Sequence, residues 1–140
     1  MYNIILVTLD TTPSDRAIIE HIKMLARALH SRVELLHVAD GWAAQRFGAE
    51  AVSPEITQDQ TYLAGVRAEF AAEDISCEAH LAYGDPAQEI VRWVEEHGCD
   101  LIAMSTHGHT FVADLVLGET ATHVQHRVSV PVLLLRAARD

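Results

Sequence analysis

The stretch AMSTHGHTFVADLVLGETATHV, residues 103–124, contains in order the parts of a loop that joins a strand to a helix at a ligand site. The apolar residues 101–104 predict a buried strand, which the small and polar residues 105–108 end. A second glycine, Gly118, precedes the expected start of a helix. Glycines let a backbone approach a ligand, and the first N–H groups of a helix can point at a phosphate. Taken alone, however, two glycines favour the simpler interpretation that both make ordinary turns.

The same alternation of strand and helix extends over the rest of the chain. Apolar runs at residues 4–9, 33–38, 76–83 and 130–135 predict four further strands, with helical patterns between them. Three of these helices begin with a capping residue followed by proline: Thr12-Pro13, Ser53-Pro54, and Asp85-Pro86 with Gln88 placed for a capping box. Such alternation predicts an α/β fold with a parallel sheet and helices on both faces.

The polar residues that follow the strands indicate where a ligand would bind. The apolar first, fourth and fifth strands are expected at the centre of the sheet or covered on both faces. Ligands bind such sheets beyond the carboxyl ends of the strands, where the strand order reverses. If the first strand neighbours the fourth, Asp10 and residues 105–108 meet in one crevice. The Asp10 carboxylate would accept from an adenine amino group or a ribose hydroxyl, or it is simply a cap or a polar strand end; both interpretations stay open.

Composition excludes several classes of protein. The 140 residues suit a single domain, 1–140. The formal net charge of -10, from ten basic and twenty acidic residues, argues against binding to nucleic acid or to anionic lipid. No apolar run is long enough to cross a bilayer and no signal-peptide pattern follows Met1, so we expect a cytoplasmic protein that is not in a membrane. Cys77 and Cys99 form no C-x-x-C motif and are expected to be free thiols.

The motifs of catalysis and metal binding are missing from the sequence. It contains no G-x-x-x-x-G-K-[ST], no G-x-G-x-x-G after the first strand and no G-x-S-x-G turn, so we predict no catalytic residue. The histidine pairs at 107 and 109 and at 123 and 126 have no acidic or cysteine partner at a ligand spacing, so we predict no metal site. His37 is interpreted as a satisfied core or edge histidine.

Four segments, in this order and spacing, resemble the universal stress protein family, and the resemblance spans nearly the whole chain. They are IILVTLD (4–10), LLHVAD (35–40), YGDPAQEIVRWVEEHGCDLIAMSTHG (83–108) and VPVLLLR (130–136). The resemblance implies a five-stranded open parallel sheet in the order 3-2-1-4-5 with four helices, a Rossmann-like fold of the adenine nucleotide alpha hydrolase-like type. It also implies a small cytoplasmic homodimer paired through the last strand, 130–136, that acts in stress response or signalling through a protein partner the sequence does not identify. Some members bind ATP or other adenine nucleotides.

The family's nucleotide motif resembles G-x-x-G, nine residues, then glycine and Ser or Thr. The spacing is kept here from Ser105 to Gly108 and on to Gly118. By resemblance, Thr8 and Asp10 would meet base and sugar, Val38 and Met104 would flank the adenine, and His109 would lie near the phosphates. The resemblance implies a site made of Thr8, Leu9, Asp10, Val38, Met104, Ser105, Gly108, His109, Gly118, Glu119 and Thr120.

Two positions depart from the motif. Ser105 replaces the first glycine, a mild change unless the backbone there needs a positive φ. Glu119 replaces the hydroxyl residue, and a carboxylate can only accept hydrogen bonds and repels phosphate. Glu119 therefore has three interpretations: it fills the anion site at its own helix N-terminus, it binds phosphate through Mg²⁺, or it points to solvent. Thr120 would partly supply the lost hydroxyl.

The departures lead to three expectations of function. We expect a retained adenosine pocket with weakened or metal-dependent phosphate binding. The alternative is a dimeric interaction module of the same family that has lost nucleotide binding. We expect no enzyme, or at most a very slow nucleotide hydrolase that uses Glu119 or nearby histidines as a base.

Overall fold

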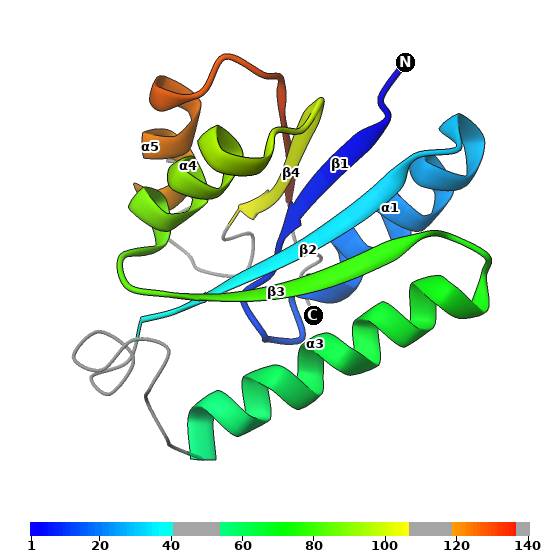
Figure 1. The fold of residues 1–140 in the computed structure, drawn as a ribbon, viewed down its shortest axis with the longest axis horizontal. Helices are drawn as coiled ribbons and strands as arrows, with labels where there is room; N and C mark the ends of the chain where they lie inside the picture. Colours follow the sequence, from blue (N-terminus) through cyan, green and yellow to red (C-terminus); the bar gives the residue numbers. More distant parts are fainter. Residues whose placement is uncertain (41–53, 107–118, 137–140) are drawn as a thin grey trace.

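The computed structural model describes residues 1–40, 54–106 and 119–136, and for Glu119 its backbone only. The described elements alternate between strand and helix as predicted (Figure 1). They are β1 (Ile4–Thr8), α1 (Asp15–Leu29), β2 (Arg32–Ala39), α3 (Pro54–Ala72), β3 (Cys77–Tyr83), α4 (Pro86–His97), β4 (Leu101–Thr106), α5 (Glu119–Arg127) and β5 (Val132–Arg136). All strand pairs are parallel and the order is β3-β2-β1-β4-β5, which confirms the expected 3-2-1-4-5 sheet.

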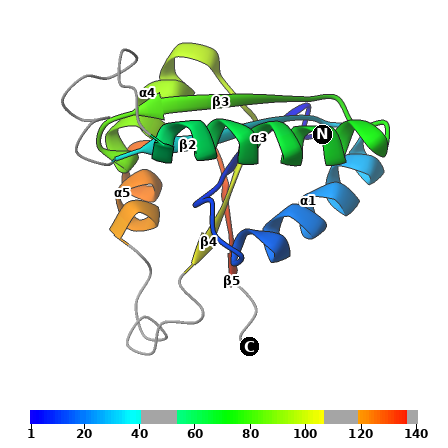
Figure 2. The ribbon, with the colours of Figure 1, turned by 90° about the horizontal axis from the view of Figure 1, so that it is seen from below.

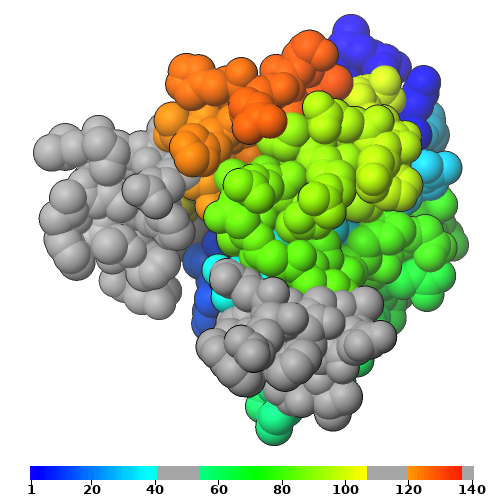
Figure 3. Space-filling view, turned by 60° about the vertical axis from the view of Figure 1, so that its left-hand side comes forward, coloured from blue at the N-terminus to red at the C-terminus, as the bar shows by residue number. Residues whose placement is uncertain are grey.

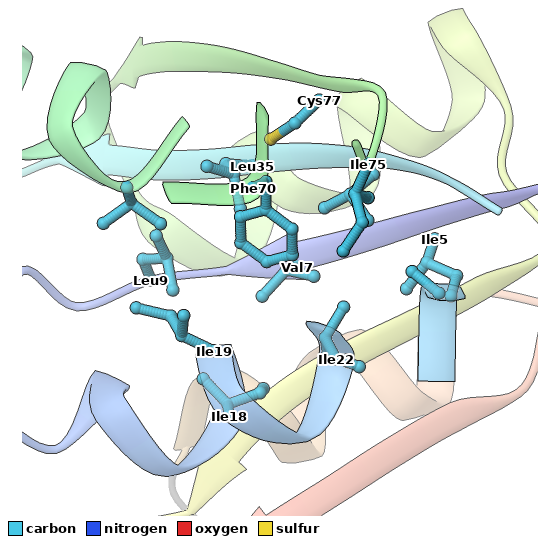
Figure 4. Close-up of a cluster of buried hydrophobic side chains, with 14 of the residues drawn as sticks. Ile5, Val7, Leu9, Ile18, Ile19, Ile22, Leu35, Phe70, Ile75 and Cys77 are labelled. Atoms are coloured by element: carbon cyan, nitrogen blue, oxygen red, sulfur yellow. The ribbon is translucent and has the colours of Figure 1, made fainter. Parts of the chain in front are cut away.

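Helices cover both faces of the sheet. Helices α1 and α3 lie on one side of the strands and α4 and α5 on the other (Figure 2). On the first face, Ile18, Ile19 and Ile22 of α1 lie below Val7 of β1, and Phe70 of α3 lies above it (Figure 4). On the second face, residues of α4 and α5 pack against the alternate side chains of β1 and β4. Because successive strand residues face opposite sides, β1 supplies both cores.

The fifth strand does not lie where its composition placed it. Apolar strands were expected at the centre of the sheet or covered on both faces, but β5 is an edge strand and residues 132–135 are only half-buried. A central place is therefore wrong for β5, but its side chains do pack on both faces of the sheet: Leu133 and Leu135 against the core under α1 and α3, and Val132 and Leu134 against the core under α4 and α5. The central places belong to β1, β2 and β4, each of which pairs with a strand on both sides.

The helix starts agree with the sequence at α4 and differ at α1. The Asp85 carboxylate accepts from the Gln88 N–H at 3.0 Å, as the cap motif predicts. Helix α1, in contrast, begins at Asp15, after a turn in which the Asp15 N–H donates to the Thr12 carbonyl. Thr12 is therefore not its cap, and that prediction is wrong. The Thr12 hydroxyl pairs with the Ser14 hydroxyl at 2.5 Å, and the residue before the helix is Ser14, whose side chain makes no capping hydrogen bond. Ser53 lies outside the described residues.

Candidate functional site

A cavity of about 230 Å³ lies at the carboxyl ends of β1, β2 and β4, next to the first turns of α4 and α5. These two helices lie side by side on one face of the molecule (Figure 3, yellow-green and orange). The cavity is lined by Thr8, Leu9, Asp10, Leu36, His37, Val38, Asp40, Pro86, Ile90, Met104, Ser105, Thr120 and Ala121. This is the edge of the sheet where parallel α/β folds bind their ligands.

The cavity brings together most of the residues predicted for the site. Its lining includes seven of them, from four separate segments of the chain: Thr8, Leu9, Asp10, Val38, Met104, Ser105 and Thr120. The expectation that Asp10 and the end of the fourth strand meet in one crevice is confirmed for Ser105. Gly108, His109 and Gly118 lie outside the described residues. Glu119 is the first residue of α5, and its side chain is likewise outside the described part.

The floor of the cavity is apolar and its rim is polar. Leu9, Val38, Met104 and Ala121 are nearly fully buried and contribute apolar surface. At the rim, Asp10 is exposed to solvent. Buried apolar surface beside polar groups at fixed positions suits a flat ring that carries polar substituents.

Ser105, in the cavity lining, has a buried polar atom that indicates a ligand site. Its hydroxyl oxygen is buried, and in the described part of the chain it has no hydrogen-bond partner. A buried hydroxyl without a partner is uncommon because it loses its hydrogen bonds to water without replacement. A ligand in the cavity that carries a donor or an acceptor would satisfy it. The family motif indicates only that Ser105 is a mild departure from glycine, and it does not predict this buried hydroxyl.

The backbone before Asp10 is fixed by β2. The Leu9 N–H donates to the Leu36 carbonyl at 2.9 Å and so extends the sheet ladder beyond β1. The Leu9 carbonyl lies 2.7 Å from His37 Nδ1. A carbonyl only accepts, so Nδ1 carries a proton and donates it to this bond. Both backbone groups of Leu9 are therefore engaged, and Asp10 begins from a fixed position.

The backbone at and after Asp10 is fixed by Asp15, which is completely buried. Its carboxylate accepts from the Asp10 N–H at 3.0 Å, and from the Thr11 N–H and the Tyr62 hydroxyl at 2.8 Å each. Burial, followed by the hydrogen bond to Asp15, raises the pKa of Tyr62, so its hydroxyl remains a donor. Thr11 has φ 62°, in the left-handed region that is uncommon for a β-branched residue. The Asp15 carboxylate is thus what holds the loop in this conformation.

His37 lies in the cavity wall, which the sequence did not predict. The interpretation of His37 as a satisfied histidine is confirmed, since Nδ1 bonds Leu9 and Nε2 lies 3.4 Å from Asp59 Oδ2 of α3. Asp59 is buried on the same side of α3 as Ile56 and Leu63. The sequence did contain a signal for this contact: Asp59 lies three residues after Ile56 and four before Leu63, at the helical spacing of the buried face. A search for apolar residues alone passes over it because Asp59 is an acid.

Two helix N-termini lie beside the cavity. Thr120 and Ala121 in the first turn of α5 and Pro86 at the start of α4 line it. The positive end of a helix dipole favours anionic groups, so this side of the cavity suits phosphate better than the Asp10 side does. The described residues include no group of three or more His, Cys, Asp or Glu side chains that would hold a metal ion.

The two cysteines are free thiols and neither lines the cavity. Burial raises the pKa of Cys77 to about 12 and that of Cys99 to about 11, so both are protonated at neutral pH. A thiol, unlike a thiolate, is a poor nucleophile.

Among the described helices, none is both long and apolar enough to cross a membrane.

Comparison with known proteins places this chain among related sequences and structures. It is 39% identical to the universal stress protein Slr1230 of Synechocystis over 59 residues, which are 42% of this chain and 21% of that protein. The match thus covers only about a fifth of that relative's length. It is 24% identical to the universal stress protein MJ0577 of Methanocaldococcus jannaschii over 97% of this chain and 96% of that one.

Solved structures share the fold over nearly the whole chain. The structure of MJ0577 matches with a TM-score of 0.83 at 24% identity and covers 100% of this chain and 99% of that one. A universal stress protein in complex with cAMP matches with a TM-score of 0.73 at 18% identity, over 98% of both chains. One from Archaeoglobus fulgidus in complex with dAMP matches with a TM-score of 0.70 at 19% identity, over 95% of this chain and 97% of that one.

The universal stress protein family model matches residues 1–136, which is almost the full length of the sequence and contains every strand and helix described above. By this match, the chain belongs to the universal stress protein family.

Proposed function

We propose that this protein binds an adenine nucleotide in the cavity at the carboxyl ends of β1, β2 and β4. The observation that carries the proposal is that seven predicted site residues, from segments far apart in the sequence, line one cavity. Two structural neighbours were solved with cAMP and with dAMP, which are adenine nucleotides. These neighbours support adenine nucleotides as the class of ligand. The position of the binding site is argued from the residues of this chain that line the cavity.

The two ends of the cavity suit the two ends of a nucleotide. The adenine ring would lie on the apolar floor between Val38 and Met104. Asp10 would accept hydrogen bonds from the sugar or the base, since a carboxylate is an acceptor only. The phosphates would lie toward the start of α5, where Thr120 offers a hydroxyl and the helix dipole is positive.

Glu119 decides how strongly the phosphates bind. It is the first residue of α5, where an anion would meet the free N–H groups of the helix. A carboxylate there competes with phosphate, or it binds phosphate through a divalent cation such as Mg²⁺. We propose that adenosine binding is retained, and that binding of ATP or ADP is weaker or depends on Mg²⁺.

Calorimetric titration with ATP, ADP, AMP and adenosine, each with and without Mg²⁺, tests the proposal. Glu119→Ser is expected to tighten ATP more than adenosine because only ATP brings phosphates to that position. Glu119→Gln removes the charge at constant size, and Glu95→Gln on the exposed face of α4 is the matched control for a change in net charge. An equal change for ATP and adenosine contradicts the electrostatic argument. No heat and no thermal shift with any ligand contradicts nucleotide binding itself.

The wider role is also part of the proposal. We propose one domain over residues 1–140, in a cytoplasmic protein that acts in stress response or signalling through a protein partner rather than as an enzyme. We further propose a homodimer paired through residues 130–136, because the apolar residues 132–135 of the edge strand β5 are only half-buried. An open apolar edge strand is a template for pairing. A monomer mass by light scattering at high concentration contradicts the dimer.

A second candidate function is a dimeric interaction module without nucleotide. The observation that favours it is the position of Glu119 at the first residue of α5, together with Asp10 and Asp40 in the lining of the same cavity. Three acids around one site oppose the binding of a polyanion. Extraction and mass measurement of any small molecule that copurifies separates the candidates, since a copurified nucleotide ends the second one.

A further inference from the structure

We propose that Tyr62 and Asp59 of α3 are positioning residues for the nucleotide site: they hold the loop that presents Asp10. The proposal rests on the proposed function only in assigning a ligand to Asp10. Two side-chain contacts carry the proposal. Tyr62 contacts Asp15 and Asp59 contacts His37, and both Asp15 and His37 bind the backbone of the loop around Asp10.

The first support runs from Tyr62 through Asp15. The Tyr62 hydroxyl donates to Asp15 Oδ2, and the same carboxylate accepts from the N–H groups of Asp10 and Thr11. Tyr62 and Asp15 are 47 residues apart in the chain. Because the carboxylate is fully buried, its orientation is set by these three donors and not by water.

The second support runs from Asp59 through His37. Asp59 Oδ2 lies 3.4 Å from His37 Nε2, and His37 Nδ1 donates to the Leu9 carbonyl. The opposite nitrogens of one ring thus join α3 to the last backbone carbonyl before Asp10. The contact with Asp59 is an ion pair when both ring nitrogens carry a proton, and it then holds the ring in the orientation that turns Nδ1 toward the loop.

The side chains of Asp59 and Tyr62 project from the same side of α3. Asp59 and Tyr62 are three residues apart, which places both on one face of the helix. Between them they fix the backbone on both sides of Asp10, whose own side chain is exposed and lines the cavity. The loop has left the sheet ladder here and Thr11 takes a left-handed conformation, so regular secondary structure does not hold it. The position of α3 therefore sets the position of the Asp10 carboxylate.

The direct test is the affinity of AMP in a double-mutant cycle. Tyr62→Phe removes one hydroxyl and keeps the ring, and it is expected to weaken AMP binding by roughly threefold to tenfold, as for the loss of one hydrogen bond. In an Asp10→Ala background the same substitution is expected to change nothing, because the carboxylate that Tyr62 positions is gone. Tyr2→Phe, the same chemical change at the other end of β1, is the matched control and is expected to leave affinity unchanged. Asp59→Ala repeats the cycle for the second support.

An equal loss of affinity in both backgrounds would mean general damage to the fold and would overturn the proposal, as would an unchanged affinity in Tyr62→Phe. Hydrogen exchange of the apo protein gives a readout that needs no ligand. Tyr62→Phe should speed exchange at the Asp10 and Thr11 amides. It should not change the amides of Asn3 and Ile4, which donate to a different carboxylate, that of Asp100, at 2.8 Å each.

The two measurements separate two failures. If the wild-type chain binds neither AMP nor any other ligand of the calorimetric titration, the proposed function fails and hydrogen exchange alone decides the role of α3. If exchange at Asp10 and Thr11 is unchanged in Tyr62→Phe, the positioning role is wrong whether or not AMP binds.

Discussion

The substitution Asp15→Asn tests whether one buried carboxylate holds the loop between β1 and α1. Asp15 has no exposed surface, and its two oxygens accept three hydrogen bonds, one at Oδ1 and two at Oδ2. Asparagine has the same shape but only one oxygen. Its amide nitrogen is a donor and must face at least one group that is also a donor.

The expected cost follows from counting these bonds. If the amide oxygen takes the Oδ2 position, it keeps Thr11 and Tyr62, and the amide nitrogen faces the Asp10 N–H. One hydrogen bond to a charged group is lost, at about 1.5–3 kcal/mol, and the two that remain become weaker neutral bonds. The reverse orientation loses two bonds. We therefore expect the free energy of unfolding to fall by about 3 kcal/mol.

Urea denaturation followed by far-ultraviolet circular dichroism measures this loss. Asp85→Asn is the matched control: Asp85 is also a carboxylate at a helix start, but it is exposed and accepts one N–H, that of Gln88. Because Asn caps helices about as well as Asp, we expect less than about 0.5 kcal/mol there. Equal losses for the two variants, or a loss below about 1 kcal/mol at Asp15, would refute the view that three buried bonds hold the loop.

Three further predictions concern residues outside the cavity. Lys23, whose side chain is 8% exposed, lies within 3.0–3.3 Å of Glu20 on α1, Glu69 on α3 and Glu73, which follows the end of α3. Lys23→Met should therefore cost about 1–3 kcal/mol by urea denaturation, and Arg67→Met, which breaks an exposed pair, should cost less than about 1 kcal/mol. Thr11→Gly relieves the left-handed φ and should raise stability by up to about 1 kcal/mol by thermal unfolding, whereas Thr12→Gly should lower it. Burial raises the Cys77 pKa from 9.0 to about 12. The contribution of this thiol to the free energy of unfolding is therefore complete below pH 9 and is lost as the pH rises toward 12. Cys77→Ala should therefore flatten the decline in unfolding free energy between pH 9 and 11, by at most about 1.4 kcal/mol per pH unit, and an unchanged slope would contradict the shift.

Local patterns predicted the elements of this fold and the residue types of its site. The alternation of apolar runs with helical periodicity required only neighbouring residues, and it produced all the described strands and helices. The Asp85 cap was equally local and is confirmed. The order of the strands and the roles of Thr8, Val38 and Met104 came from the resemblance to a family, since nothing in their spacing places three separate segments around one cavity.

Tertiary structure alone decided how the site is held. In the sequence, Asp15 is one acid near the start of a helix and Asp59 is one acid between apolar positions, and neither pattern predicts burial. Both are buried, and each contacts a side chain from another element of the fold. The position of β5 at the edge also follows from packing, because hydrophobic content alone cannot distinguish a strand covered by neighbours from one with an open edge. The sequence by itself thus determined an α/β chain with the residues that we propose for a nucleotide site. The contacts that we propose to fix Asp10 depend on the packing of α3 against β2 and β3. A hydrogen bond between residues 47 apart is a property of the folded geometry and leaves no periodic pattern in the sequence.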